Sequence, residues 1–268
     1  MDAEIAKSLA REYWANGFID GIPLLNADEV ARHRSHLEEA ERVLGHSLHY
    51  VNKVHTVLRS AYELATAPTL VNQVEEILGP DILLYDVTYI IKEPGSSKFV
   101  SFHQDLTYWG FDGTEQVSAW LALSPATPES GCMRMIPGSH QQGLKEQVIG
   151  EDKDNVLNLS QTIEDVNEDD AIFSTLRPGE FSLHHGWTIH SSGPNRSTDR
   201  RIGLNIQYIS PRLKQTKSDS DSAMLIRGND PFGHFIDDVP ATEWLPENAK
   251  ALLKERTEAY KAISGTPN

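Results

Sequence analysis

The sequence contains one cysteine, few basic residues and no long apolar run. Cys132 on its own cannot form an intramolecular disulfide or build a thiolate cage around a metal. No apolar stretch approaches the roughly 20 residues that cross a bilayer. The first residues are acidic and amphipathic, without the basic and apolar segments of a secretory signal. We therefore expect a soluble, cytoplasmic protein.

Basic residues are scarce relative to acidic ones. The chain has 24 Lys and Arg residues against 39 Asp and Glu residues, which gives a formal net charge of −15. Nucleic acid requires Lys and Arg against its phosphates, and anionic membranes attract polybasic surfaces. We therefore expect neither nucleic acid nor a membrane as a partner, and the charge itself favours solubility.

The apolar residues are numerous enough for one sizeable core, since 39% of the 268 residues are hydrophobic. Helical spacing and stop signals predict a helix that ends at Gly17, and others over 27–44 behind an Asn26 cap, over 71–78 and over 248–263. β-Branched and aromatic residues predict strands over 82–92, 99–103, 116–123, 132–136, 180–185 and 202–209.

No long helix lies between the predicted strands, which disfavours parallel βαβ units and favours an antiparallel sandwich or barrel. We expect a single domain over 1–268, mainly β with flanking α-helices. It comprises a helical buttress over 1–80, a β core over 82–210 and a C-terminal helix over 248–263.

Residues 151–170 resemble neither the predicted helices nor the predicted strands, because they carry eight acidic side chains and one lysine. This stretch is too long for a simple hairpin turn and too polar for a core. A solvated loop and a lid over a binding site both fit, since long loops in compact domains are often functional.

The triplet His103-Gln104-Asp105 lies where a predicted strand ends. Residues two apart on an extended backbone point to the same side, so the imidazole and the carboxylate can bind one cation together. Two histidines and one carboxylate with open positions form the facial triad of non-haem Fe(II) oxygenases. This pair therefore predicts a metal site if a second histidine joins it.

Three histidines downstream compete for that position: His184, His185 and His190. The first two lie inside a predicted strand, where one of them can pack or support a ligand through a hydrogen bond. We favour His190, because it lies near a strand end, as His103 does.

Arg200 and Arg201 stand just ahead of the predicted strand 202–209. A planar guanidinium binds a carboxylate through two parallel hydrogen bonds, which an oxygenase using a dicarboxylate reductant requires. A solvated surface pair or a phosphate site is the alternative for either arginine.

Together these elements resemble the phytanoyl-CoA hydroxylase family of Fe(II)- and 2-oxoglutarate-dependent dioxygenases over about residues 82–210. The segment 103–106 (HQDL) resembles the proximal motif of that family, 131–140 (GCMRMIPGSH) its central segment and 189–197 (IHSSGPNRS) its distal motif. The resemblance implies a double-stranded β-helix, that is, a cupin-like jelly-roll core with buttressing helices.

The resemblance also implies roles for individual residues. His103, Asp105 and His190 would hold Fe(II), with O₂ and 2-oxoglutarate as co-substrates. The co-substrate arginine of the family falls eleven residues after the distal histidine, which corresponds to Arg201. Because Asp105 is present, hydroxylation is favoured over the halogenation of relatives that replace this carboxylate with a small residue.

Two further positions follow from the resemblance. Trp120 would line the 2-oxoglutarate pocket, with ordinary core packing as the alternative, and Ser192 would bind the co-substrate carboxylate beside the arginine. His140, in the central segment, is expected to be structural.

The substrate is expected to be a small polar molecule. Segments 91–94 (IKEP), 103–110 (HQDLTYWG) and 200–208 (RRIGLNIQY) resemble the bacterial branch that hydroxylates organophosphonates such as 2-aminoethylphosphonate. Lys92, Arg134 or Arg196 could then meet the phosphonate, with surface solvation as the alternative for each, and acidic groups near the mouth could hold the ammonium. An amino acid, a compatible solute or an acyl-CoA are alternative substrates. A cupin-like isomerase or a binding protein is the non-oxygenase alternative, and the sequence does not predict an oligomeric state.

Overall fold

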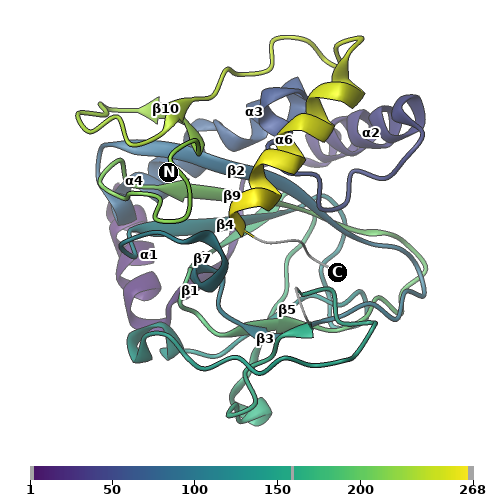
Figure 1. Ribbon diagram of the computed structural model, residues 1–268. Helices are drawn as coiled ribbons and strands as arrows, with labels where there is room; N and C mark the ends of the chain where they lie inside the picture. The colour runs from purple at the N-terminus through teal and green to yellow at the C-terminus, as the bar shows by residue number, and fades with distance from the viewer. Residues whose placement is uncertain (1–2, 158–159, 265–268) are drawn as a thin grey trace.

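Two β-sheets flanked by helices make up the computed structural model, which describes residues 3–157 and 160–264 (Figure 1). Within this part of the chain, seven strands form the larger sheet, in the spatial order β1 (Phe18–Pro23), β7 (Glu180–His185), β4 (Gln116–Ala122), β9 (Arg201–Ile209), β2 (Ile82–Lys92), β10 (Ser222–Arg227) and β11 (Ile236–Asp237). Four more form the smaller sheet, in the order β3 (Val100–His103), β8 (His190–Ser192), β5 (Met133–Met135) and β6 (Ile172–Ser174). The arrangement is a cupin-like jelly roll, so the predicted fold class is confirmed.

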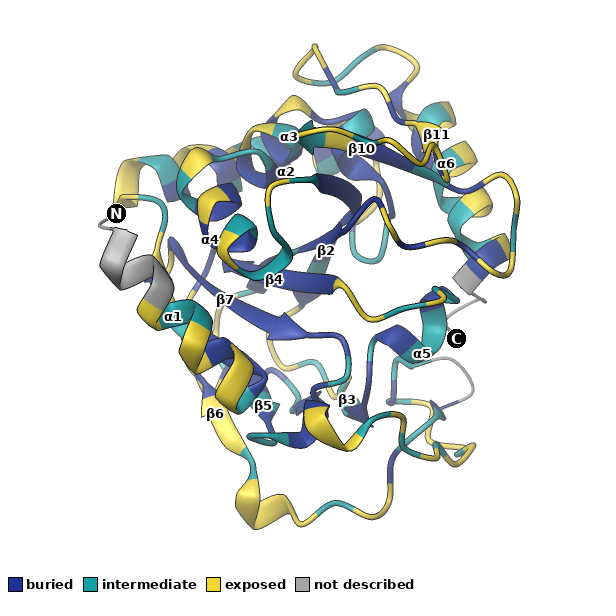
Figure 2. Ribbon diagram, turned by 90° about the vertical axis from the view of Figure 1, so that its left-hand side faces the viewer, coloured by how far each residue is buried: buried dark blue, intermediate teal, exposed yellow. Residues whose placement is uncertain are grey.

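The helices lie mainly on the outside of the larger sheet. The α-helices are α1 (Ala3–Asn16), α2 (Ala27–Leu44), α3 (Arg59–Ala65), α4 (Pro68–Leu78), α5 (Leu106–Trp109) and α6 (Ala249–Ser264), and the 3₁₀ helices are η1 (Val54–Thr56), η2 (Ser139–Gln142) and η4 (Glu168–Asp170). Figure 2 shows the buried strands of this sheet beneath helices whose outward sides are exposed. None of the helices in the described ranges combines the length and apolar composition needed to cross a membrane.

The outer face of the larger sheet is apolar and forms the main core with the helices. Tyr13 of α1 and Leu37 of α2 are at most 1% exposed and belong to the same buried cluster as Val87, Leu121 and Leu204 of the sheet. Each fully buried side chain of this kind stabilises the fold by about 1.5–3 kcal/mol relative to leaving it exposed. Helices α1 and α2 therefore pack against one face of the sheet, and much of the opposite face is available for a site.

Local chemistry accounts for the elements that agree with the sequence prediction. At α2, the Asn26 side chain accepts a hydrogen bond from the Glu29 backbone, and the Glu29 side chain accepts one from the Asn26 backbone, which makes a capping box. Gly45, with a φ of 75°, ends the helix in the left-handed conformation. Strands β2 and β7 have the predicted bounds. Strands β3, β4 and β9 differ from the prediction by one residue at one end, and β5 is shorter by one residue at each end.

Several short elements differ from the prediction. Residues 18–23, expected within a helical stretch, form β1, which pairs with β7 at the edge of the larger sheet. Gly21 and Pro23 are unusual in strands, so the sequence pattern does not predict one here. An edge strand tolerates proline because the backbone N–H groups on its outer side do not pair with another strand. Helix α3 was not predicted, and α4 begins at Pro68 rather than at residue 71, because proline suits the first turn of a helix.

Candidate metal centre

The inner face of the larger sheet carries several buried polar side chains, in contrast to its apolar outer face. Residues alternate along β2 and β9, so that Asp86 and Thr88 lie beside Gln207 and Asn205 on the side away from the helices. These four residues line a cavity between the two sheets, together with residues of β3, β5 and β8. Polar side chains on a buried strand face are costly unless they have a function or partners, so this cavity is the candidate site.

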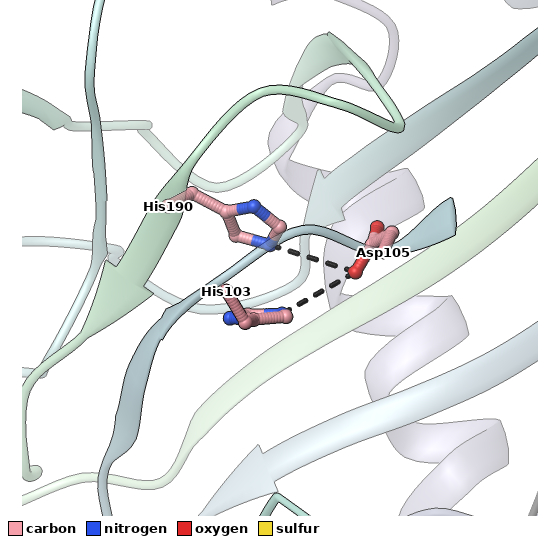
Figure 3. A group of neighbouring side chains, drawn as sticks. All are labelled: His103, Asp105 and His190. Carbon is pink, nitrogen blue, oxygen red and sulfur yellow. Dashed lines mark ion pairs between the residues drawn. The ribbon is translucent and has the colours of Figure 1, made fainter. Parts of the chain in front are cut away.

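Two histidines from the smaller sheet face each other at this cavity (Figure 3). His103 ends β3 and His190 begins β8, and the antiparallel register places them directly opposite each other. Their ring centroids are 4.1 Å apart. The structure thus brings together two residues that are 87 positions apart in the chain.

Backbone carbonyls orient both imidazole rings. Nδ1 of His103 donates to the Ser101 carbonyl at 2.9 Å, and Nδ1 of His190 donates to the Thr188 carbonyl at 3.0 Å. A ring that donates from Nδ1 keeps the lone pair on Nε2 free for a metal. Burial lowers the pKa of His190 to about 3, so this ring is neutral at physiological pH, as a metal ligand must be.

Asp105, the residue that directly precedes α5, completes the group. Its Oδ1 lies 3.3 Å from Nε2 of His103 and 3.7 Å from Nε2 of His190. Burial raises the pKa of Asp105, but the adjacent His190, His103 and His184 together bring it well below its usual value. The carboxylate is therefore ionised, and the three candidate ligand atoms all lie within 4.8 Å of one another.

His184 and Ser118 support the carboxylate from the sheet behind it. Nε2 of His184 and Oγ of Ser118 each lie 3.2 Å from Oδ2 of Asp105, which leaves Oδ1 facing the imidazoles of His103 and His190. Of the three histidines that competed for the distal position, His190 therefore lies with the other two candidate ligands, and His184 contacts the far oxygen of the carboxylate. His185 points elsewhere, since its Nδ1 accepts the Trp187 backbone N–H at 3.0 Å.

Arg201 is buried at the start of β9 and has few partners. Its side chain is 1% exposed, and only Nη1 makes a hydrogen bond, at 3.3 Å to the Gly131 carbonyl. Its Nε and Nη2 have no partner among the described residues. Burial lowers the pKa of Arg201 to about 10, which still leaves it charged at neutral pH. A buried guanidinium with two unpaired donors calls for an anion, and a carboxylate fits it.

Arg200, the alternative arginine, has a different environment. Its guanidinium lies 2.8 Å from Glu41 and 2.9 Å from Glu93, so its charge is already paired. The two adjacent arginines therefore differ: Arg200 pairs with two glutamates, whereas Arg201 lines the cavity and has no acidic partner among the described residues.

Trp120 and Gly131 shape the arginine site. The Arg201 guanidinium lies 5.1 Å from the centroid of the Trp120 ring, and both residues line the cavity. Gly131 has a φ of 74°, and a Cβ there would lie 2.3 Å from the Gly193 carbonyl, so only glycine fits at this point. The central segment GCMRMIPGSH thus supplies the carbonyl that holds Arg201.

Ser192 lines the cavity beside a buried lysine. Lys92 pairs with Arg201 across β2 and β9, and its Nζ donates to Ser192 Oγ at 2.8 Å and to the Gly193 carbonyl. Burial, reinforced by the charge of Arg201, lowers the pKa of Lys92 to about 6. The sequence analysis considered Lys92 for a phosphonate and missed this position beside Arg201.

The remaining walls come from distant parts of the chain. Tyr108 and Trp109 of α5 and Tyr260 of α6 line the cavity with aromatic surface. Val156 and Leu157 of the acidic segment also line it, whereas positions 158 and 159 of that segment lie outside the described residues. His140 is not part of the candidate ligand group in the described residues, and its Nε2 lies 3.2 Å from the Trp14 carbonyl, so a structural role stays the prediction.

Comparisons with known proteins agree with this geometry. Residues 16–203 match the family model of phytanoyl-CoA dioxygenase (PhyH). The rice (Oryza sativa subsp. japonica) protein named Phytanoyl-CoA dioxygenase 1 is 35% identical over 121 residues, which cover 45% of this chain and 42% of that protein. The human peroxisomal phytanoyl-CoA dioxygenase is 28% identical over 157 residues, which cover 57% of this chain and 46% of that protein. The chain thus spans less than half the length of these two relatives.

A solved structure matches nearly the whole chain. The non-heme monooxygenase ThoJ in its apo form has a TM-score of 0.82 and 27% identity, and the match covers 96% of this chain and 100% of that one.

Proposed function

Because the chain belongs to the phytanoyl-CoA dioxygenase (PhyH) family, we propose that it is an Fe(II)- and 2-oxoglutarate-dependent dioxygenase that hydroxylates an aliphatic carbon of a small polar substrate. One observation carries the proposal: a ligand set of two histidines and a carboxylate lines the same cavity as a buried, unpaired arginine. The ligand set suits non-haem iron with open positions, and the arginine suits a dicarboxylate. The similarity to proteins named as dioxygenases and as a non-heme monooxygenase supports the same chemistry.

The metal ligands would be His103, Asp105 and His190. With iron and 2-oxoglutarate bound, the site would have the oxidising power that these groups supply together with O₂. His184 and Ser118 hold Asp105 by its Oδ2, so that its other oxygen stays directed at the metal position.

The co-substrate contacts would come from Arg201, Ser192 and Trp120. Nε and Nη2 of Arg201 have the donor geometry for the remote carboxylate of 2-oxoglutarate. Ser192, which Lys92 orients, offers a hydroxyl beside it, and Trp120 fixes the plane of the guanidinium. The aromatic walls would exclude water from the reacting groups.

A spectrum of the anaerobic protein with Fe(II) and 2-oxoglutarate tests this proposal. We expect a weak visible charge-transfer band from the chelate, and loss of the band in His103→Ala and Asp105→Ala. His46→Ala, at an exposed loop position, should keep it. Absence of the band in the wild type would instead favour an isomerase or a binding protein on the same scaffold.

As the substrate we propose an organophosphonate such as 2-aminoethylphosphonate. The contacts differ from those expected, because Lys92, Arg134 and Arg196 are not among the described residues that line the cavity. Arg134 pairs with Glu168 at 2.9 Å. Apart from Arg201, the Lys or Arg side chain that lines the cavity, within the described residues, is Lys261 of α6. It is therefore the candidate contact for the phosphonate.

Succinate release from 2-oxoglutarate tests this substrate. We expect 2-aminoethylphosphonate to stimulate release above the substrate-free level, and Lys261→Met to remove most of the stimulation. If an amino acid or a compatible solute stimulates release and the phosphonate does not, the alternative substrates take its place. The single, buried cysteine suits the reducing cytoplasm that we propose as the location.

A further inference from the structure

A second polar group lies on the inner face of the larger sheet, away from the metal ligands. Asp86 is 1% exposed and accepts hydrogen bonds from the Lys53 backbone at 2.6 Å, Asn52 at 2.9 Å and Thr88 at 2.6 Å. The Lys53 ammonium pairs with Asp238 at 3.1 Å instead of with Asp86. A carboxylate has about four acceptor positions, so Asp86 retains one. Among the residues that the structure describes, no cationic group forms an ion pair with it.

Gln207 lies beside Asp86 and has an unused acceptor. The two residues are paired across β2 and β9, and both line the cavity. Gln207 is 5% exposed, and its buried Oε1 has no hydrogen-bond partner within residues 3–157 and 160–264. A buried, unpaired amide oxygen is costly unless a ligand supplies a donor. Two acceptor groups, one of them a carboxylate, thus line the same part of the cavity.

The register relates this pair to the metal centre. Ser118, which donates to Asp105, is the partner of Gln207 across β4 and β9. Asp86 therefore lies two strands from Ser118, which is about 10 Å across the sheet. A substrate held at Asp86 and Gln207 would place a carbon several bonds away beside the metal position.

The surroundings favour a cation. Tyr108, Trp109 and Tyr260 line the cavity, and aromatic faces attract cationic groups. Two non-glycine residues near Asn52 adopt left-handed conformations, Tyr50 with a φ of 54° and Lys53 with a φ of 57°. Such strain is typical of functional segments, and here it brings Tyr50 and Asn52 to the cavity wall.

We propose that Asp86 and Gln207 form a subsite for the cationic amino group of the substrate. This inference rests on the proposed function for its meaning, because it names the substrate class of the same site. A protonated amine donates several N–H hydrogen bonds, and its positive charge would pair with the Asp86 carboxylate. A carboxylate or phosphate at this point would meet two acceptors, and an acyl chain would bury both without partners.

Equilibrium binding of plain amines to the whole protein tests the subsite. The probes are the n-alkylamines from ethylamine to n-hexylamine, each against the n-alkanol of the same length, titrated calorimetrically at neutral pH. We expect at least one amine to bind ten times more tightly than its alkanol. The preference should disappear in Asp86→Asn and in Gln207→Leu, and it should increase in Gln207→Glu, which adds a second charge.

Tighter amine binding by Gln207→Glu cannot be explained by misfolding, because a misfolded cavity would bind the amine less tightly. Asp237→Asn, which neutralises an exposed carboxylate of β11, should leave the amine preference unchanged. If no amine binds better than its alkanol, or if Asp86→Asn retains the preference, the subsite is disproved.

The same samples separate this inference from the proposed function. The charge-transfer band with Fe(II) and 2-oxoglutarate reports on the metal centre and does not require the amine. A band without an amine preference overturns only the subsite. An amine preference without a band supports the subsite and leaves the protein a binder of amines.

Discussion

Arg201 is among the largest side chains that the fold buries completely, and no acidic side chain in the described part of the chain pairs with its charge. We expect Arg201→Lys to weaken 2-oxoglutarate binding about 10- to 100-fold, because a hydrogen bond to a charged group contributes about 1.5–3 kcal/mol and lysine cannot replace both. Titration of the charge-transfer band with 2-oxoglutarate measures this. Arg200→Lys, at the neighbouring surface ion pair, should bind normally, and equal losses in both variants would contradict the assignment.

We expect Lys92 to make the binding of 2-oxoglutarate depend on pH. Because burial lowers its pKa to about 6, Lys92 is neutral in the free protein above that pH, and an anion bound beside it favours its protonated form. Binding of 2-oxoglutarate should therefore take up a proton above about pH 6, and its affinity should fall by up to about tenfold for each pH unit. Calorimetry in buffers of different ionisation enthalpy measures the uptake. In Lys92→Met we expect weaker binding without this pH dependence, and an unchanged slope would show that Lys92 is not involved.

Some site residues could be located from the sequence and others could not. His103, Asp105, His190 and Arg201 lie in local motifs with fixed spacing, and the structure brings them to one cavity. Asp86 alternates with apolar residues in a buried strand, which was a usable signal of an inward polar position. By contrast, the position of the Gln207 side-chain oxygen next to Asp86 depends on which strands pair, and the local sequence does not contain this information.

Within β9, one glycine allows the strand to pass beneath an aromatic ring. A Cβ on Gly203 would lie 1.8 Å from Cζ2 of Trp120. We expect Gly203→Ala to lower the free energy of unfolding by about 1–3 kcal/mol, the usual cost of overpacking, and to weaken 2-oxoglutarate binding by displacing the ring from Arg201. Urea unfolding and the co-substrate titration measure the two effects.

The double variant Gly203→Ala/Trp120→Phe provides the control. The smaller ring should restore part of the stability that Gly203→Ala loses, because the two positions are in contact. Purely additive losses would show that the strain arises elsewhere.

An element can be predicted from the sequence to the extent that local interactions determine it. Long strands such as β2 and a capped helix such as α2 have enough apolar spacing and stop signals to be found directly. Strand β8, with three residues, exists because β3 and β5 lie on either side of it. Its pairing, which places His190 opposite His103, is a long-range property that no local pattern contains.

The negative charge of the whole molecule lies largely outside the cavity. Glu164 and Asp165 of the acidic segment are exposed, whereas Leu157 of the same segment lines the cavity. We expect Glu164→Gln/Asp165→Asn to change the KM for 2-oxoglutarate by less than about twofold, since isolated surface charges contribute little. Leu157→Ala should raise 2-oxoglutarate consumption in the absence of substrate, because it opens the cavity to water. The reverse pattern would mean that the charges themselves act at the site.

The two faces of the larger sheet also determine how such a protein can diversify. The side chains that pack against α1 and α2 belong to the main core, whereas Thr88 and Asn205 line the cavity and lie outside that core. Exchanges at Thr88 or Asn205 would therefore change the lining of the cavity without loosening the apolar packing beneath these helices. Under the proposed function, a sheet of this kind would allow substrate preference to change while the helix-packed face and the candidate metal centre stay the same.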